Sequence, residues 1–379
     1  MIGTTTKLLL LVASGWIHST AHAASPPLWY DLDETYTFPA FLRDFGKRYD
    51  DADEYKRRQS IFQENLRGIL RHNSGVFRAS QTGVAGSKAV HHQGYVLGIN
   101  QFADSHPEEI PTGLAKTPRY YSSMDSSRIS TSSTRKLHGD VKAFLPYALD
   151  DPISELPKEI DWRTKGVVTP VKSQGRCGSC WAFASTAVLE SHLAINTGKL
   201  FELSEQQLVS CAPNPRHCGG LGGCAGSVAT IAYEHIRDHG MVQEWEFGYQ
   251  SNDGKEIPCS LKNKTSTTLE SSSVRGRPQS SGAYYQQAVV SLAGYVELEK
   301  NNYLALMNAV ARMGPVAVSV TAIPWRFYAG GVFSMPFNTS DTKSTDVNHL
   351  VVLDGYGTDP VTKEDYWLVR NSWSPVSQH

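Results

Sequence analysis

The sequence predicts an α+β protein in two units, a small helical one followed by a larger one of mixed structure. A Ser/Thr-rich break at residues 120–135 separates them, because a stretch with so few apolar side chains cannot support a packed core. In the larger unit, helical patterns come first and short β-branched or aromatic runs come after Pro258. This order favours two halves that face each other across a cleft.

Length and charge narrow the possible functions only a little. At 379 residues the chain is long enough for two or three domains. Its formal net charge is −1 and the charged residues are scattered, so the sequence offers no basic face for nucleic acid and no acidic tail. We expect a monomer with no nucleic-acid partner.

The first 23 residues have the pattern of a secretory signal peptide. Lys7 precedes the apolar stretch Leu8–Trp16, and the small residues Ala21 and Ala23 follow. The apolar stretch is well short of the roughly 20 residues that a membrane span needs, which disfavours the alternative of an anchored N-terminal helix. We expect cleavage after Ala23 and a product of the secretory pathway, either extracellular or in a lysosome or vacuole.

The secretory route is oxidising and therefore permits disulfides. Two sequons, which begin at Asn263 and Asn338, fit the same route as acceptors of N-linked glycans. The cysteines available for disulfides are Cys177, Cys180, Cys211, Cys218, Cys224 and Cys259.

The small unit contains a long helix with one mixed stripe. Polar and apolar residues recur at steps of three or four, which places them on one face of the helix. Such a face is either solvated, or its charges and amides form an internal polar network. The stripe consists of Glu54, Arg58, Phe62, Asn65, Ile69 and Asn73.

Beyond this helix, an alternating pattern predicts a strand. A short acidic helix that begins at Pro107 is expected after it. The alternating residues are Gly98, Asn100, Phe102 and Asp104.

The larger unit opens with a helix that is apolar on nearly every side. It begins at Cys180 and stops at Gly198, so we expect it to be buried. Ser204 and Gln207 form a capping box for the next helix. The later runs "GPVAVSV", "HLVVLDGYG" and "YWLVRNSW" predict strands, and the Ser/Thr-rich stretch 262–283 predicts an exposed insertion.

Cys180 lies in "SQGRCGSCWAF" and has three candidate roles. A zinc ligand needs a second Cys pair or two His at suitable spacing, but His217, Cys218 and Cys224 stand irregularly among glycines. A thioredoxin-like dithiol needs a preceding strand, whereas "TPVKSQGR" is loop-like. We expect no metal and no other cofactor, and a nucleophile explains more of the local sequence.

A nucleophilic thiolate is favoured at the N-terminus of a buried helix. It also needs an imidazole that exchanges protons with it, and His349 stands out because it opens an apolar strand. Asn371 is the candidate partner that orients the imidazole, and Trp373 is placed to shield that hydrogen bond from water. Gln174, just upstream of the cysteine, is the candidate oxyanion donor.

Together, "QGRCGSCWAF", "NHLVVLDGYG" and "YWLVRNSW" resemble the papain-like cysteine peptidases. The helical stripe and the residues of Gly98–Asp104 resemble the two pro-region motifs of the cathepsin L-like branch. The resemblance runs from about Phe41 to Trp373. It implies a papain-like two-lobed catalytic domain, with a helical lobe and an antiparallel β-barrel-like lobe, preceded by a helical propeptide domain.

The resemblance implies hydrolysis of peptide bonds in polypeptide substrates through a thioester acyl-enzyme. Cys180 would be the nucleophile, His349 the general acid/base, Asn371 the orienting residue and Gln174 an oxyanion donor. The implied substrate-binding positions are Gly226, Ser227, Asn348 and Trp373.

The resemblance also implies two disulfides and leaves two thiols unpaired. One bridge would join Cys177 to Cys224 and the other Cys211 to Cys259. Cys180 would stay free and Cys218 has no partner.

The implied product is a zymogen whose own propeptide is its inhibitor, with an extended segment lying through the cleft. Acid activation is implied, because protonating carboxylates such as Asp104 weakens the polar network of the pro-region. The expected parts are a signal peptide (1–23), an inhibitory propeptide domain (24–118), a linker and activation segment (119–149) and a peptidase domain (150–379).

The chain departs from the family pattern at two places, and the second departure favours a rival hypothesis. Ser227 stands where the family has a glycine, and after "NSW" the chain reads "SPVSQH" instead of continuing into further strands. We therefore expect the peptidase domain to be incomplete at its C-terminus. The third bridge common in the family is also missing, because no cysteine follows Cys259. The rival is a catalytically silent or truncated homologue whose pro-region binds and inhibits related peptidases.

Overall fold

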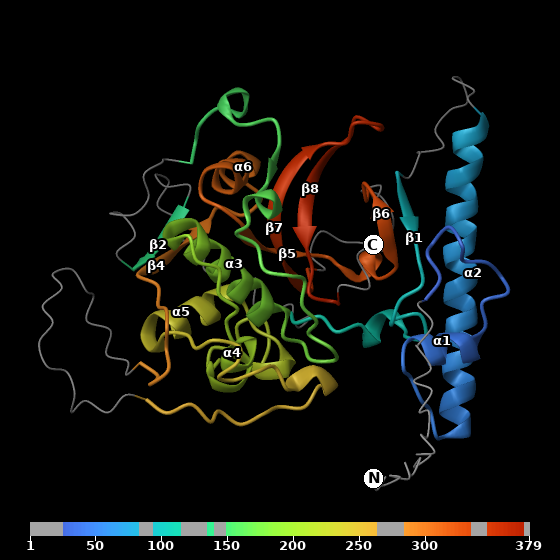
Figure 1. Ribbon diagram of the computed structural model, residues 1–379, viewed down its shortest axis with the longest axis horizontal. Coiled ribbons are helices and arrows are strands. Elements are labelled where there is room, and N and C mark those ends of the chain that lie inside the picture. Colours follow the sequence, from blue (N-terminus) through green and yellow to red (C-terminus); the bar gives the residue numbers. More distant parts are fainter. Residues whose placement is uncertain are drawn as a thin grey trace, which may run out of the picture.

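The computed structural model describes residues 26–82, 94–114, 135–139, 149–263, 284–334 and 347–374. The expected signal peptide lies outside these residues, as do nearly all of the Ser/Thr-rich break, most of the insertion after Lys262 and the sequon at Asn338. Figure 1 shows the helical small unit standing beside the larger unit.

Most of the described helices and strands follow the predicted order, but the helix α6 (Tyr303–Arg312) lies among the strands that come after Pro258. The helices are α1 (Phe38–Asp44), α2 (Ala52–Thr82), α3 (Cys180–Thr197), α4 (Glu205–Cys211), α5 (Ala229–His239) and α6 (Tyr303–Arg312). The strands are β1 (Tyr95–Leu97), β2 (Arg135–Gly139), β3 (Ile160–Asp161), β4 (Gly294–Leu298), β5 (Val316–Val320), β6 (Tyr328–Gly331), β7 (His349–Thr358) and β8 (Asp365–Arg370).

Aromatic side chains hold α1 against α2. The rings of Phe38 and Phe41 on α1 lie 5.5 and 5.0 Å from that of Phe62 on α2. Phe62 and Ile69 are each only 1% exposed. The apolar members of the predicted stripe therefore form the core of the small unit, where aromatic pairs at such distances add to the free energy of burial.

The polar members of the stripe bind the backbone that follows α2. Asn65 Nδ2 donates to the Ala103 carbonyl at 3.0 Å. Asn73 donates to the Leu97 carbonyl at 2.7 Å and accepts the Leu97 N–H at 2.9 Å. Of the two readings, the internal polar network is confirmed.

The strand predicted over Gly98–Asp104 is wrong. Strand β1 ends at Leu97, and turns follow it. The Asn100 side chain accepts the Phe102 N–H at 3.0 Å, and such local bonds from Asn favour turns over strands. The expected acidic helix is a single 3₁₀ turn, η1 (Pro107–Glu109).

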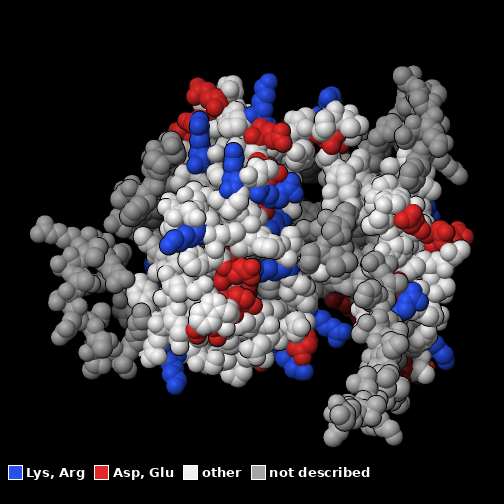
Figure 2. All heavy atoms as spheres, viewed as in Figure 1, with Lys and Arg blue, Asp and Glu red and all other residues white. Residues whose placement is uncertain are grey.

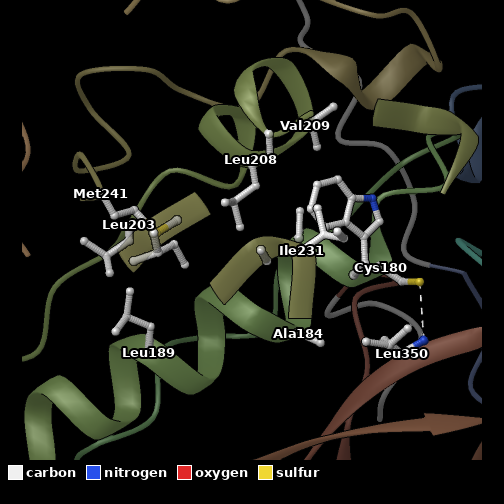
Figure 3. Close-up of a cluster of buried hydrophobic side chains, with 14 of the residues drawn as sticks. Cys180, Ala184, Leu189, Leu203, Leu208, Val209, Ile231, Met241 and Leu350 are labelled. Carbon is white, nitrogen blue, oxygen red and sulfur yellow. Dashed lines mark hydrogen bonds between the residues drawn. The ribbon is translucent and has the colours of Figure 1, made fainter. Parts of the chain in front are cut away.

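Helix α3 is buried, as predicted. Every residue from Cys180 to Thr186 is buried. The helix ends where Gly198 adopts φ = 70°, a left-handed conformation that glycine reaches without steric cost. Figure 3 shows the apolar side chains that surround the helix, among them Leu203, Leu208, Ile231, Met241 and Leu350.

Only half of the predicted capping box forms. Ser204 Oγ accepts the Gln207 N–H at 2.9 Å and caps α4. The Gln207 side chain instead donates to the Gly240 carbonyl at 2.7 Å and accepts the Val242 N–H at 2.9 Å. The Ser204 N–H already donates to the Val242 carbonyl at 3.1 Å, so it is not available to Gln207.

The β half is an antiparallel sheet built around β7. Strands β5 and β3 pair along one edge of β7, and β8 pairs along the other. Gly355 is required where β3 crosses, because a Cβ there would overlap the carbonyl of Ile160. The two-lobed α+β architecture is as expected, but in the described residues the sheet is open and does not close into a barrel.

Two short antiparallel ribbons connect early segments of the chain to the larger unit. Strand β1 of the small unit pairs with β6, and β2, which follows the Ser/Thr-rich break, pairs with β4. The two ribbons lie on opposite sides of the larger unit (Figure 1).

Acidic and basic side chains are interspersed on the face shown in Figure 2. That face therefore carries no large patch of a single charge, in keeping with the small net charge of −1.

Candidate active site

Cys180 begins α3 and lies where the two halves meet. Its Sγ accepts the N–H of Leu350 on β7 at 3.3 Å (Figure 3). Burial raises the pKa of the Cys180 thiol to about 12, against a smaller lowering by backbone N–H groups. The sulfur is fully buried, so desolvation outweighs the helix N-terminus and the thiol is neutral in this state.

His349 opens β7 and contacts two residues that follow β8. Its Nε2 lies 2.8 Å from Asn371 Oδ1, and its ring lies 4.8 Å from the ring of Trp373. Strands β7 and β8 are antiparallel, so the residues after Arg370 return to the start of β7. Burial lowers the pKa of His349 to about 4, and the hydrogen bond that its Nε2 donates to Asn371 Oδ1 opposes this to a smaller degree.

The second ring nitrogen of His349 is available for chemistry. Nδ1 is buried and has no hydrogen-bond partner in the described part of the chain. The next residue, Leu350, is the one whose N–H meets Cys180 Sγ. A free imidazole nitrogen at the start of β7, and a thiol that accepts the N–H of the next residue, are the groups that proton exchange between a base and a nucleophile requires.

The Gln174 side chain is fully buried and held from both ends. Its Oε1 accepts the Ser372 hydroxyl at 2.7 Å. Its Nε2 donates to the carbonyl of Cys177 at 2.9 Å and to that of Pro111 at 3.3 Å. The amide N–H₂ group therefore faces both the loop before Cys180 and the segment that lies over the site.

That segment is residues 111–114 of the small unit, which cross over Cys180. A Cβ added to Gly113 would lie 2.5 Å from Cys180 Sγ and would also overlap the carbonyl of Gly178. Leu114 enters the core cluster around α3. Only a glycine allows the backbone to lie this close to the sulfur.

The predicted substrate-binding residues line the path of this segment. The Ser227 N–H donates to the Gly113 carbonyl at 3.0 Å, and the Asn348 carbonyl accepts the Leu114 N–H at 3.1 Å. Trp373 Nε1 donates to the Pro111 carbonyl at 3.2 Å. Gly226 packs so closely on Gly113 that a Cβ on it would overlap the Gly113 carbonyl.

The cysteines near the site are placed as the resemblance implies. Cys177 is bonded to Cys224, and Cys211 to Cys259. Cys180 and Cys218 are free and buried. In the described residues, no group of three or more His, Cys, Asp or Glu side chains is arranged to hold a metal ion.

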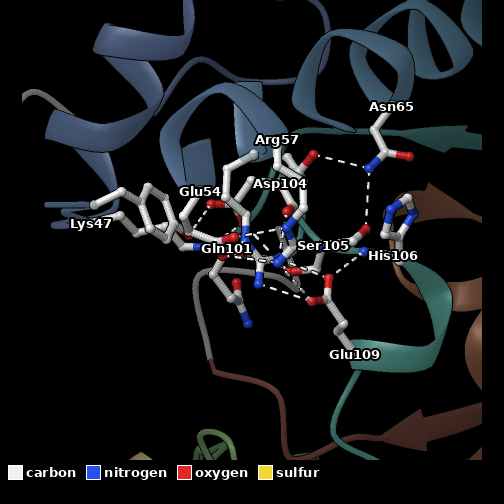
Figure 4. A network of polar contacts seen from close by, with 12 residues as sticks. Lys47, Glu54, Arg57, Asn65, Gln101, Asp104, Ser105, His106 and Glu109 are labelled. Atoms are coloured by element: carbon white, nitrogen blue, oxygen red, sulfur yellow. Dashed lines mark hydrogen bonds and ion pairs between the residues drawn. The ribbon is translucent and has the colours of Figure 1, made fainter. Parts of the chain in front are cut away.

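A polar network anchors the small unit beside the site (Figure 4). Asp104 is fully buried, binds Lys47 through one carboxylate oxygen and accepts the Tyr49 hydroxyl at 2.5 Å through the other. Arg58 donates to the Asp104 carbonyl at 2.9 Å and to Glu109 at 2.7 Å. The stripe of α2 and the turn at Asp104 thus form one unit.

Sequence reasoning missed the contacts of Pro111 and Gly113. The extended segment was expected, but nothing in "IPTGL" marks the residue that meets the sulfur, apart from a glycine with no turn pattern around it. It also missed the buried polar side chains behind the site, such as Thr169 and Glu190.

Comparisons with known proteins agree with this geometry. Residues 156–377 match the model of the papain family cysteine protease, and residues 38–110 match that of the cathepsin propeptide inhibitor domain (I29). The chain is 33% identical to cathepsin S of Bos taurus, over 87% of this chain and 80% of that protein.

It is also 33% identical to the oryzain beta chain of Oryza sativa subsp. japonica, over 85% of this chain, but it spans only 55% of that relative's length. The solved structure of digestive procathepsin L 3 from Tenebrio molitor larval midgut superposes with a TM-score of 0.64 at 28% identity, covering 90% of this chain and 89% of that one. Among the described residues, no helix has the length and apolarity that a membrane crossing needs.

Proposed function

Because the chain belongs to the papain family of cysteine proteases and carries a cathepsin propeptide inhibitor domain, we propose that it is the zymogen of a cysteine endopeptidase. The observation that carries the proposal is the meeting of Cys180, His349, Asn371 and Gln174 beneath residues 111–114. No described feature favours the catalytically silent alternative.

The proposed reaction hydrolyses a peptide bond through a thioester. Cys180 Sγ attacks the carbonyl carbon after giving its proton to His349 Nδ1, which has no hydrogen-bond partner in the described residues. His349 then protonates the leaving amine, and a water molecule that it deprotonates releases the acid. Asn371 holds the imidazole through Nε2, and Gln174 Nε2 and the Cys180 N–H stabilise the oxyanion.

The small unit acts as the intramolecular inhibitor. Residues 111–114 occupy the backbone hydrogen-bonding groups of Ser227 and Asn348 that an extended polypeptide substrate needs. They also exclude water from Cys180 and His349, which keeps the thiol and the imidazole neutral. Inhibition is therefore both a steric block and an electrostatic one.

The proposal includes the limits of the signal peptide, propeptide, activation segment and peptidase, and the cellular location. We place the signal peptide at residues 1–23, the inhibitory propeptide at 24–118, the activation segment at 119–149 and the peptidase from 150 onward. The protein enters the secretory pathway and acts outside the cell or in a lysosome or vacuole as a monomer. Asn263 is exposed, as a glycan acceptor must be.

The test is acid incubation followed by labelling with a thiol-directed epoxide. We expect one label per molecule, lost in Cys180→Ala. The matched control is Cys218→Ala, which removes the other buried free thiol and should leave labelling unchanged. A correctly folded protein without Cys180-dependent label would sink the proposal and would favour the silent inhibitor.

A further inference from the structure

A line of buried polar groups runs from α3 to β8 behind the candidate active site. Thr169 Oγ1 donates to Glu190 Oε2 on α3 at 2.5 Å. Arg370 Nη1, at the end of β8, donates to the hydroxyl and the carbonyl of Thr169 at 3.1 and 3.0 Å. One hydroxyl thus donates to the first element and accepts from the second.

Both ends of the line are anchored by further charged groups. Lys172 Nζ lies 2.9 Å from Glu190 Oε1 and 2.7 Å from Glu205 Oε1. Arg370 Nε lies 2.9 Å from Asp354 Oδ2. All three carboxylates are at most 1% exposed, so water cannot readily replace a partner that moves away.

The two elements that Thr169 connects are those that carry the candidate catalytic groups. Helix α3 begins at Cys180. Strand β8 ends at Arg370, and Asn371, which binds His349, follows directly. In the described residues, Thr169 is the side chain that hydrogen-bonds both elements at once.

We propose that Thr169 is a positioning residue, whose hydroxyl holds α3 and β8 at the spacing that lets the Cys180 thiol and the His349 imidazole meet. The inference rests on the proposed function. A hydroxyl between a carboxylate and a guanidinium satisfies both over a narrow range of separations. A displacement of about 1 Å at reacting atoms can lower a rate on the order of 100-fold.

The test replaces Thr169 by Val in the full chain, which is then activated by acid and titrated with the epoxide to count active sites. Val has nearly the same volume but no hydroxyl, so Glu190 Oε2 loses its donor. We expect kcat per active site to fall about 10-fold while KM changes less than about 2-fold, since the substrate-binding backbone is not touched. Thr169→Ser keeps the hydroxyl and should restore kcat.

The matched control is Thr186→Val in helix α3, one of the two elements that Thr169 connects. Thr186 is fully buried, and its hydroxyl has no hydrogen-bond partner among the residues that the structure describes. Removing it leaves no group unpaired, so kcat and KM should match those of the unchanged protein. The comparison separates loss of a particular hydrogen bond from the general effect of a β-branched apolar residue inside the lobe.

Two further measurements keep the inference falsifiable. If Thr169→Val yields no folded protein, Arg370→Lys takes its place, because one ammonium cannot bind both Thr169 and Asp354 as the guanidinium does; the same fall in kcat is expected. The pH profile of Cys180 alkylation in the activated protein should also shift, by about half a pH unit on its acid limb, if the thiol and imidazole are repositioned.

The outcomes distinguish the two claims. An active parent protein with an unchanged kcat and alkylation profile in Thr169→Val, even with a lower melting temperature, overturns the inference alone. An inactive parent protein contradicts the proposed function and the inference with it. The inference is supported if kcat falls in Thr169→Val, returns to the parent value in Thr169→Ser and stays unchanged in Thr186→Val.

Discussion

At the scale of the residue, Gly113 decides how close the inhibitory segment comes to the sulfur. Its missing side chain lets the backbone lie on Cys180, and its carbonyl accepts the Ser227 N–H. A segment with any other residue at this point would have to lie farther from Cys180 Sγ, and water would then reach the thiol.

Gly113→Ala should therefore weaken inhibition. The added methyl group would overlap the Gly178 carbonyl and Cys180 Sγ. Both neighbours are buried, so we expect the pro-segment to be the part that moves. We expect epoxide labelling of the unprocessed zymogen at neutral pH to become at least about 10-fold faster, which corresponds to about 1.4 kcal/mol.

Gly68→Ala is the control for this substitution. Gly68 lies in α2, and a Cβ there would meet nothing within 4 Å. Alanine is also favoured over glycine in a helix by about 1 kcal/mol. Labelling as slow as in the parent zymogen is expected; if Gly113→Ala is equally slow, close contact at Gly113 does not govern inhibition.

At the scale of the element, Asn73 is the joint between helix α2 and strand β1. Its amide satisfies both backbone groups of Leu97 and is 4% exposed. Strand β1 in turn pairs with β6 of the larger unit. Asn73 thus couples the helix to the ribbon, and through the ribbon to the peptidase unit. His72 Nε2, which lies 3.1 Å from the Tyr95 carbonyl, makes a second link.

Asn73→Ala should loosen this coupling. Two buried backbone groups lose their partners, at a cost of roughly 1–3 kcal/mol each before relaxation. We expect the unfolding midpoint of the small unit to fall, as measured by thermal denaturation of the zymogen. The control is Ser74→Ala at the exposed neighbouring residue, which should change stability by no more than about 0.5 kcal/mol. Equal effects of the two substitutions would contradict the role of Asn73 in linking α2 to β1.

At the scale of the whole molecule, particular carboxyl groups in the two units respond to acid in opposite directions. Hydrogen bonds from Arg57 and Arg58 lower the pKa of Glu54 to about 2, and those from His106 and Arg58 outweigh burial and lower the pKa of Glu109. A depressed carboxyl pKa stabilises the fold above its unfolded value and loses that contribution as the pH falls. Acid therefore weakens the small unit.

Asp354 in the larger unit shows the reverse. Burial raises its pKa to about 6, although Arg370 opposes the shift. A folded-state pKa above the unfolded value gives a contribution that is full below about pH 4 and is lost as the pH rises through about 6. At this group, acid therefore favours the peptidase unit. His235 and His349 act in the opposite direction, because burial lowers their pKa values to about 3 and about 4.

Asp354→Asn should remove this pH dependence. Between about pH 4 and pH 6 the parent protein is expected to lose up to about 2–3 kcal/mol from this group, whereas the variant should show a correspondingly flatter profile. The difference is measured by unfolding the activated protein in urea at a series of pH values, with tryptophan fluorescence as the signal. Parallel profiles would show that Asp354 stays ionised throughout.

The sequence predicted local structure well where one residue controls it. Helix α3 with its stop at Gly198 follows from local backbone preferences, and so does the Ser204 cap. Prediction failed where a distant group competes. Gln207 binds the chain at Gly240 and Val242 instead of its own cap, and Asn100 turns a segment whose alternation resembled a strand.

The sequence by itself determined the types of group available for chemistry and their order along the chain. Cys180 at a helix start, His349 at a strand start and Asn371 after the next strand could be named from it, since each stands in a local pattern. It also determined the mixed stripe of α2, because helical periodicity places those residues on one face.

Only the tertiary structure decided the protonation states of these groups and the contacts that hold them in place. The neutrality of Cys180 and His349 comes from burial beneath a segment far away in the chain, and the hydrogen bond from Arg370 to Thr169 joins residues 201 positions apart. Both depend on solvent exclusion and on distances between elements. These are properties of the packed molecule that no local pattern of residues encodes.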